Sequence, residues 1–476
     1  MARLTLEQKV RLLTGVDSWA LHGESAIGLR PIVMSDGPAG VRGTHMDPAN
    51  PSTSLPCPVA LGATWDPDLV KELTTALGRE VRSKGIDVLL APTVNIIRTP
   101  LSGRGFECFS EDPLLTSQIA VAYVRGLQRA GVGATAKHYV ANDSETQRRT
   151  YNARISERVL RELYLPPFEA CVGEGDVLLV MAAYNGVNGA TMTANSVLLQ
   201  DVLKGDWGFS GVVVSDWSAT TSTVPSAMAG LDLVMPGPDG PWADKLLAAV
   251  RNGTVPESAI DDKVTRILIM ARRLGGFDGR SAAAPIELID PALLRTVTSS
   301  SFVLLSNRRA LLPLDRAALK SVTLIGPNVF APQAQGGGSV LVLPALRVQL
   351  AESLRQALAS TTRVGVQQGC VTSATVPIPA EGTMRDPVTG SEGVRIQIRN
   401  ADGEVSYDAP MPSSVITWWH GLPKAVTPPA RRSTCGPPTA PSPKGCISSV
   451  WQVWVARASP STGLCWPRRP ASIPAR

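Results

Sequence analysis

The strongest constraint on the fold is a repeat of short apolar runs that each turn polar at their end. Six such runs begin at Pro31, Val88, Gly133, Val177, Gly211 and Leu231. Longer amphipathic stretches separate them, such as those from Asp66 and from Ser156, and we expect Ser156 to be a helix N-cap. Runs that are apolar at their start and continuous are typical of parallel strands buried on both faces. The repeat therefore predicts alternating β-strands and α-helices.

The polar ends of these runs favour a barrel over an open sheet. They read SDG, NIIR, KHY, AYN and SDW, and each stands where a strand would pass into a loop. In a β/α barrel the C-terminal ends of all strands meet at one face, where active sites are built. An open doubly wound sheet would bring ligands only to its switch point, not to five successive strands. We therefore expect an α/β fold with a TIM-like β/α barrel over residues 1–280.

The sequence after the barrel predicts a second α/β domain and then the start of an all-β insertion. A strand is expected from Ser321, a helix from about Val348 to Ser360, and the loop QGGGS between them. Further on, VRIQIRNADGEVSY alternates strictly between apolar and polar residues and contains the turn signal Asp402-Gly403, which indicates a β-hairpin.

The last part of the chain has a composition that fits neither a core nor a solvated linker. Residues 428–476 hold ten Pro, six Arg, three Cys and three Trp without a periodic pattern. We expect a non-native tail from a shifted or misassembled reading frame, with a natural disordered tail as the alternative. Eight of the 46 Lys and Arg, and none of the 40 Asp and Glu, follow Asp408, so residues 1–408 carry a net charge of −2. The overall charge of +6 therefore predicts neither nucleic-acid nor membrane binding.

Other sequence features restrict the class of protein. No run of about 18 apolar residues offers a membrane span, and the first residues, MARLTLEQKV, lack the apolar stretch of a secretion signal. We therefore expect a cytoplasmic protein. The cysteines form no C-x-x-C pair and the four histidines make no ligand pattern, so we expect reduced thiols, no metal and no cofactor.

Asp216 is the candidate for nucleophilic chemistry. It directly follows the buried run from Gly211, and Trp217 stands beside it. A nucleophile that attacks a sugar carbon must be fixed in place and flanked by an apolar platform, and this position offers both. An aspartate at a strand end is, taken alone, more often a helix cap or an ion-pair partner.

Charged residues at the other strand ends strengthen the case for Asp216. They occur at the same position in successive β-α units, where the strand ends and the loop begins. These residues are Asp36, Arg98, Arg104, Lys137 and His138. Each alone has an ordinary interpretation as an ion pair or a capped loop. Together they supply the directional donors and acceptors that bind sugar hydroxyls.

The motifs at these positions resemble a known family. The strings SDGPAGVRG, GRGFECFSEDP, KHYVANDSETQRRT, MAAYNGVNG and GVVVSDW are similar to those of glycoside hydrolase family 3, in the order and spacing of its β-glucosidases, over roughly residues 1–425. The resemblance implies a retaining, exo-acting β-glucosidase that releases terminal β-D-glucosyl residues from small β-glucosides or oligosaccharides, with Asp216 as nucleophile. It implies a sugar-binding set of Asp36, Arg42, Arg104, Lys137, His138, Arg148, Met181 and Tyr184, with Trp217 in the pocket wall. Gly105 departs from the pattern, because the motif usually has Asn there.

The resemblance also gives expectations for the second half of the chain. Residues 295–370 would be part of the family's α/β sandwich domain, whose QGGGS loop approaches the active site. Residues 371–427 would be part of a protective-antigen-type β module. In relatives with this module the acid/base Glu follows the insertion, in sequence that is absent here, so we expect a C-terminally truncated chain and leave the acid/base unassigned.

Several alternatives remain open at this point. One is an inactive remnant that binds sugar without the acid/base, and another is β-xylosidase specificity. The loop ANDSETQRR is not that of the family's N-acetylglucosaminidases, which disfavours that activity. The string GVGATA from Gly131 mimics a dinucleotide fingerprint, but it enters a strand instead of leaving one for a helix, so a nucleotide-binding protein is disfavoured. The oligomeric state is not predicted.

Overall fold

The fold was examined in a computed structural model. It describes residues 1–45, 47, 49–278, 285–329, 332–346, 348–370, 384–399, 404–411 and 453–455. The chain divides into two compact units, Met1–Gly369 and Cys370–Arg476. None of the helices in these ranges is both long enough and apolar enough to span a membrane.

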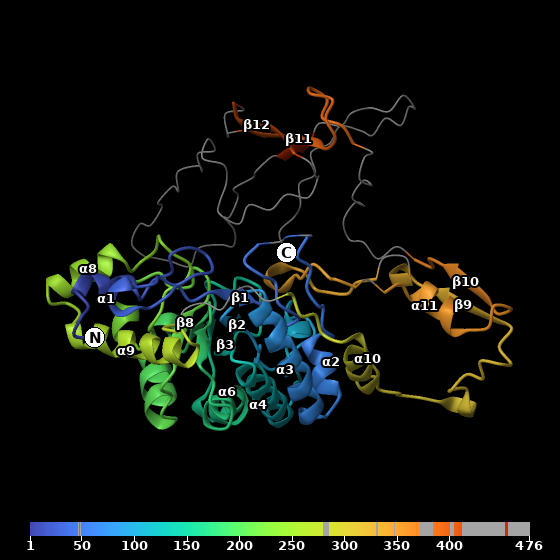
Figure 1. Cartoon of the computed structure of the whole chain (residues 1–476), viewed down its shortest axis with the longest axis horizontal. Coiled ribbons are helices and arrows are strands. Elements are labelled where there is room, and N and C mark those ends of the chain that lie inside the picture. Colours follow the sequence, from blue (N-terminus) through green and yellow to red (C-terminus); the bar gives the residue numbers. More distant parts are fainter. Residues whose placement is uncertain are drawn as a thin grey trace, which may run out of the picture. The chain divides into compact units, whose positions relative to one another are not determined.

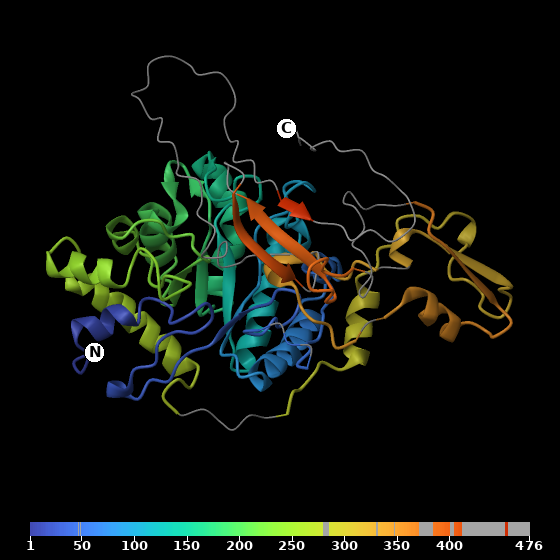
Figure 2. The same ribbon diagram turned by 90° about the horizontal axis from the view of Figure 1, so that it is seen from above.

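A curled parallel sheet forms the centre of the first unit (Figures 1 and 2). Its five strands follow the order β1-β2-β3-β5-β8. Their bounds are Met34–Asp36, Val88–Leu90, Gly133–Tyr139, Leu179–Ala182 and Val212–Ser215. Every residue in them is buried, as expected for strands covered on both faces. The strands predicted in the first five apolar runs are confirmed, and β3 begins only at Gly133, so GVGATA does lead into a strand.

The sixth run, from Leu231, does not form a regular strand. It contributes isolated parallel bridges, Leu233 with Val214 and Val234 with Thr14. Antiparallel bridges between Gly15 and Leu21 and between Ala20 and Val33 then lead back towards β1. The curl and these bridges make the domain TIM-like, although short pieces of chain replace some of the strands of a regular barrel.

Helices pack on the outside of this sheet, with α4 and α6 against β3 and α9 against β8 (Figure 1). The longer helices are α3 (Pro67–Ser83), α4 (Pro113–Arg129), α6 (Pro166–Gly173), α8 (Asp244–Arg251), α9 (Glu257–Arg273) and α10 (Pro291–Ser300). The shorter ones are α1 (Leu6–Arg11), α2 (Pro58–Ala63), α5 (Glu157–Val159) and α7 (Val224–Met228).

Capping residues start these helices where the sequence indicated. The carboxylate of Asp66 accepts a hydrogen bond from the backbone N–H of Leu69 at 3.0 Å, and Pro67 occupies the first turn of α3. Ser156 caps α5 as predicted, by accepting from the backbone N–H of Val159. The stretch then continues as a π-helix, η3 (Leu160–Tyr164), before α6.

The end of the first unit contains a smaller parallel sheet of two strands. Strand β9 (Ser321–Ile325) pairs with β10 (Arg363–Gln367), and α11 (Leu350–Ala357) lies between them in sequence. The strand predicted at Ser321 and the helix after Val348 are confirmed. A separate small sheet joins β4 (Asn152–Ala153), β6 (Gly186–Val187) and β7 (Ala190–Thr191) near the barrel strands' C-terminal ends.

The second unit contains an antiparallel sheet. Strand β11 (Val394–Arg399) lies between β12 (Val405–Met411) and β13 (Val453–Val455). The side chains of Val394, Ile396 and Ile398 form its small core. The predicted strand pair is confirmed, whereas the turn at Asp402-Gly403 and, apart from β13, the predicted tail at 428–476 lie outside the described residues.

Candidate active site

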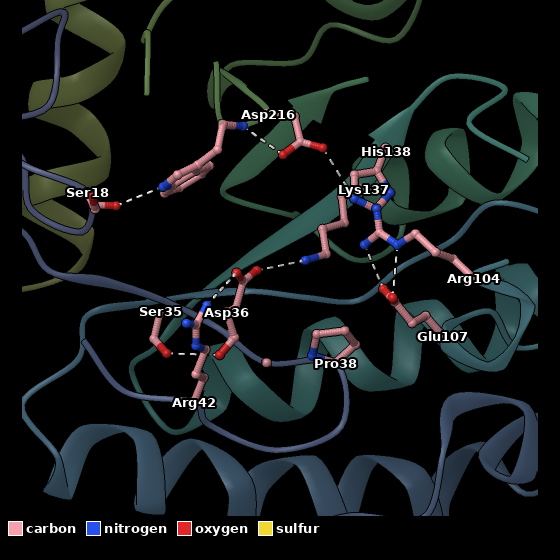
Figure 3. A network of polar contacts seen from close by, with 12 residues as sticks. Ser18, Ser35, Asp36, Pro38, Arg42, Arg104, Glu107, Lys137, His138 and Asp216 are labelled. Atoms are coloured by element: carbon pink, nitrogen blue, oxygen red, sulfur yellow. Dashed lines mark hydrogen bonds and ion pairs between the residues drawn. The ribbon is translucent and has the colours of Figure 1, made fainter. Parts of the chain in front are cut away.

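Most of the predicted site residues lie at or just after the C-terminal ends of the barrel strands (Figure 3). Asp36 ends β1, Lys137 and His138 stand near the end of β3, and Asp216 directly follows β8. Because parallel strands end on one side of a sheet, side chains far apart in sequence meet there. Lys137 reaches Asp36, and His138 faces Asp216, so these four residues lie together.

Asp36 and Lys137 form a buried ion pair. The Lys137 ammonium donates to Asp36 Oδ1 at 3.2 Å, and Lys137 is only 1% exposed. Arg42 lies on the other side of the carboxylate, with its Nη1 4.0 Å from Asp36 Oδ2. A charge buried this deeply is stable only when it is paired, so each member fixes the other in the site.

His138 is held by Asn95 and stays uncharged. The Asn95 amide donates to the His138 carbonyl and accepts from its backbone N–H, both at 2.9 Å, and Asn95 Oδ1 lies 3.3 Å from His138 Nδ1. Burial, together with the positive charges of Arg104, Lys137 and Arg148, holds the pKa of His138 well below its ordinary value. Asn95 Oδ1 can accept a proton carried on Nδ1, and a proton carried on Nε2 would point towards Asp216 Oδ2.

Asp216 has one oxygen fixed and the other unengaged. Oδ1 accepts from the backbone N–H of Trp217 at 2.7 Å, whereas Oδ2 receives no hydrogen bond from the described residues and lies 3.6 Å from His138 Nε2. Burial raises the pKa of this carboxyl group, and the charges of Arg104 and Lys137 oppose that rise. The carboxylate is therefore oriented, desolvated and supplied with a free lone pair.

Arg104 borders Asp216 from the loop after β2. Its guanidinium makes a bidentate pair with Glu107, at 2.9 and 2.7 Å, across the short helix η2 (Gly105–Glu107). The pair fixes the plane of the guanidinium, whose charge acts on both Asp216 and His138.

Arg148 and Tyr184 meet on another side of the site. The Arg148 Nη1 pairs with Glu145 Oε2 at 2.7 Å, and its guanidinium carbon lies 4.4 Å from the centre of the Tyr184 ring. Burial, the negative charge of Asp216 and the approach of the Tyr184 hydroxyl to that carboxylate raise the pKa of Tyr184, so its hydroxyl keeps its proton. Met181 lies buried within β5, where it pairs in register with Val214.

Two tryptophans form an apolar wall beside Asp216. The Trp217 indole N–H donates to the carbonyl of Ser18 at 2.9 Å, and the rings of Trp19 and Trp217 lie 5.6 Å apart. Arg42 stacks over Trp19 at 5.4 Å. The sequence pointed to Trp217 but missed Trp19, which lies in an N-terminal loop outside any of the quoted strings.

Three further polar residues, Asn95, Arg98 and Glu107, lie in the segment after β2. Asn95 and Glu107 were not singled out from the sequence, although both stand inside strings that were, NIIR and GRGFE. Arg98, a candidate for the charged cluster, pairs with Asp143 at 2.6 Å and is well exposed. In the part of the chain that the structure describes, no group of three or more His, Cys, Asp or Glu is placed to hold a metal ion.

The QGGGS loop lies against the segment that carries Arg104. The Gln335 amide donates to Ser54 Oγ at 3.1 Å, and Ser52 forms a parallel bridge with Pro344. A Cβ atom on Gly336 would come within 2.1 Å of the Phe106 ring, so a side chain there would force the ring to move. The loop therefore supports the same turn that holds Arg104 and Glu107.

The family profile described as the glycosyl hydrolase family 3 N-terminal domain matches residues 17–270. The chain belongs to this family. It is 43% identical to a β-glucosidase of Rhizobium radiobacter over 372 residues, which are 77% of this chain and 45% of that protein. It is also 43% identical to β-glucosidase B of Emericella nidulans over 402 residues, which are 83% and 46% of the two chains. The chain thus spans about half the length of the curated relatives it matches.

Solved structures of β-glucosidases are also similar to this chain. The β-glucosidase of Kluyveromyces marxianus in complex with glucose superposes with a TM-score of 0.76 and 32% identity, over 87% of this chain and 51% of that one. β-Glucosidase 3B of Thermotoga neapolitana, also in complex with glucose, gives 0.71 and 34%, over 76% and 54%. The TIM-like domain predicted from the sequence is therefore the domain these enzymes share.

Proposed function

We propose that this protein acts on β-glucosides as a retaining, exo-acting β-glucosidase with Asp216 as its nucleophile. The observation that carries the proposal is the state of the Asp216 carboxylate, fixed at Oδ1 and unengaged at Oδ2 within a cluster of paired charges. The names of the relatives and the glucose in two of the similar structures support the choice of sugar.

The proposed chemistry begins with attack by Asp216 Oδ2 on the anomeric carbon. The bond from that carbon to the leaving oxygen breaks as the new ester bond to Asp216 forms, and water later hydrolyses the glycosyl-enzyme. Asp36 would accept hydrogen bonds from sugar hydroxyls, and Lys137 and Arg104 would donate them. Trp217 supplies an apolar surface for the ring, and Tyr184 remains a neutral neighbour of the carboxylate.

The proton donor of this reaction is not assigned. A retaining enzyme needs a second carboxyl group about 5 Å from the nucleophile. Four carboxylates beside the site residues are engaged with arginine or lysine side chains, namely those of Asp36, Glu107, Asp143 and Glu145. This engagement favours a second candidate function, a sugar-binding protein that does not complete hydrolysis by itself.

An activated substrate separates the two functions. With 2,4-dinitrophenyl β-glucoside the leaving group needs little protonation, so a competent Asp216 releases dinitrophenol in a burst even without a proton donor. We expect the burst in the full chain, none in Asp216→Ala, and an unchanged burst in Asp206→Ala, which removes an exposed carboxylate paired with Arg161. Glucose binding without release in any of the three proteins would establish the sugar-binding alternative. The matching β-xyloside, run in parallel, decides the sugar preference.

The second part of the proposal concerns the residues after the barrel. We infer that residues 295–370 belong to an α/β sandwich and that residues 371–427 begin a protective-antigen-type β module. The parallel pair of β9 and β10 supports the first assignment, and the antiparallel pair of β11 and β12 supports the second.

A further inference from the structure

Three buried polar side chains without hydrogen-bond partners meet at one small cavity beside the proposed sugar site. Thr93 Oγ1, Ser102 Oγ and both amide atoms of Asn142 have no partner among the described residues. The three residues are 2%, 6% and 7% exposed. All three line a cavity with ≈ 10 Å³ of space for water-sized centres, whose wall also includes Arg104 and His138. Because buried polar groups are almost always paired, the cavity is where their partner must lie.

These three side chains lie on the two segments that carry the site residues, Thr93 and Ser102 after β2 and Asn142 after β3. Thr93 bridges to Lys137, and the N–H of the following residue donates to the Lys137 carbonyl at 2.6 Å. Ser102 stands two residues before Arg104, and Asn142 stands four residues after His138. One ligand bound by all three would join the segments that orient Arg104, Lys137 and His138.

Gly105 lies beside one of the three side chains. A Cβ atom there would lie 3.1 Å from the unpartnered Ser102 Oγ and 3.8 Å from Ile97. The backbone of Gly105 is not in the left-handed region, so a side chain is sterically allowed there at the cost of a small shift of Ser102. This chain has glycine where the motif quoted above usually has asparagine, and it thereby lacks a side chain that would face the Ser102 hydroxyl.

The size and charge of the cavity select its ligand. A space of about 10–15 Å³ for the probe centre holds one water molecule, which typically makes about three hydrogen bonds. Arg104 on the wall disfavours a cation and Asp143 disfavours an anion, which leaves a neutral molecule. Water can accept from the Asn142 Nδ2–H and donate to Asn142 Oδ1 or to a hydroxyl oxygen.

We propose that one water molecule occupies this cavity, bridges Thr93, Ser102 and Asn142, and takes the place of a side chain at Gly105. The three residues are then positioning residues, because they touch the water and not the sugar. Through it they fix the loops that present Arg104 and His138. The inference rests on the proposed function only in its expectation that glucose is the ligand of the site.

A crystal structure of the full chain at high resolution tests the water directly. We expect one ordered water within hydrogen-bond distance of all three side chains. A cavity without density, or side chains that turn to pair with each other, would overturn the proposal. This outcome does not depend on hydrolysis, so it is separate from a failure of the proposed function.

Glucose affinity, measured by calorimetry, tests the positioning role. Thr93→Val removes the hydroxyl at nearly constant volume, and Asn142→Leu removes the amide. We expect each variant to bind glucose about tenfold more weakly, because the water loses one of its hydrogen-bond partners in a buried network. Thr93→Ser keeps the hydroxyl and should bind like the unchanged protein. Gly105→Asn should keep the affinity and exclude the water, whereas Gly105→Ala should keep the water.

Two other sets of results would overturn either the water proposal or the proposed function. If Asn142→Leu and Thr93→Val bind glucose unchanged and melt at higher temperature, the cavity is dry and the proposal is wrong, because removing unpaired buried polar groups stabilises a protein. If the unchanged protein shows the water but binds no glucose or activated glucoside, the proposed function fails while the water site stands.

Discussion

The buried pair of Asp36 and Lys137 should respond unequally to the loss of its two members. Asp36→Asn removes one charge at nearly constant shape and leaves the Lys137 ammonium, 1% exposed, without its carboxylate. An uncompensated buried charge of this kind costs about 3–5 kcal/mol of unfolding free energy. Lys137→Met leaves Asp36 with Arg42 at 4.0 Å, so we expect a smaller loss of about 1–3 kcal/mol.

Urea unfolding of the single and double variants measures these differences. The double variant Asp36→Asn with Lys137→Met should be more stable than Asp36→Asn alone, because it leaves no unpaired charge. Glu162→Gln serves as the control, since its pair with Arg158 is exposed and should be worth less than about 1 kcal/mol. A loss from Lys137→Met that equals or exceeds the loss from Asp36→Asn would refute the reasoning.

Three further predictions follow from the site. Asp216→Asn should raise the melting temperature at neutral pH, because burial raises the folded-state pKa of Asp216 above its unfolded value. The contribution of Asp216 to stability is therefore present at low pH and is lost as pH rises through the folded pKa, so the gain from Asn should shrink as pH falls. An equal gain in melting temperature at all pH values would contradict this. His138 should show no ring titration by NMR around its ordinary pKa of about 6.5, because burial and three neighbouring cations depress its pKa; a titration there would show the ring to be solvated. Gly336→Val should lower stability through a clash with Phe106, and Phe106→Ala should partly relieve it in the double variant; additive losses would place the two residues apart.

The sequence was most informative about the ends of the barrel strands. A parallel sheet puts all its strand ends on one side, so Asp36, Lys137, His138 and Asp216 could be grouped before any coordinates were considered. A continuous apolar run indicates a strand that is buried on both faces, which explains why five runs were predicted correctly. The run from Leu231 carries the same signal, yet its residues form only isolated bridges, because the pattern reports burial and not the number of hydrogen bonds made to a neighbour.

Contacts between loops could not be predicted in the same way. Trp19 contacts Trp217 although the two are far apart in sequence, and Asn95 binds the backbone of His138 from the loop after β2. Such pairs depend on loop paths, which no periodicity encodes. The departure at Gly105 was visible in the sequence as a missing asparagine. Only the structure shows that the unpartnered atoms of Thr93, Ser102 and Asn142 face a shared space.

The unengaged oxygen of Asp216 has a consequence for the lifetime of the protein as well as for chemistry. A desolvated acceptor without a donor makes the folded state less stable than it would be with a hydroxyl group against it. A sugar that provides this hydroxyl binds only the folded chain, and at 100 times its dissociation constant it would add about 2.7 kcal/mol to the unfolding free energy. Thermal protection by candidate sugars would then rank them by affinity without a single bond being cleaved, and the protein's resistance to proteolysis would follow its supply of ligand.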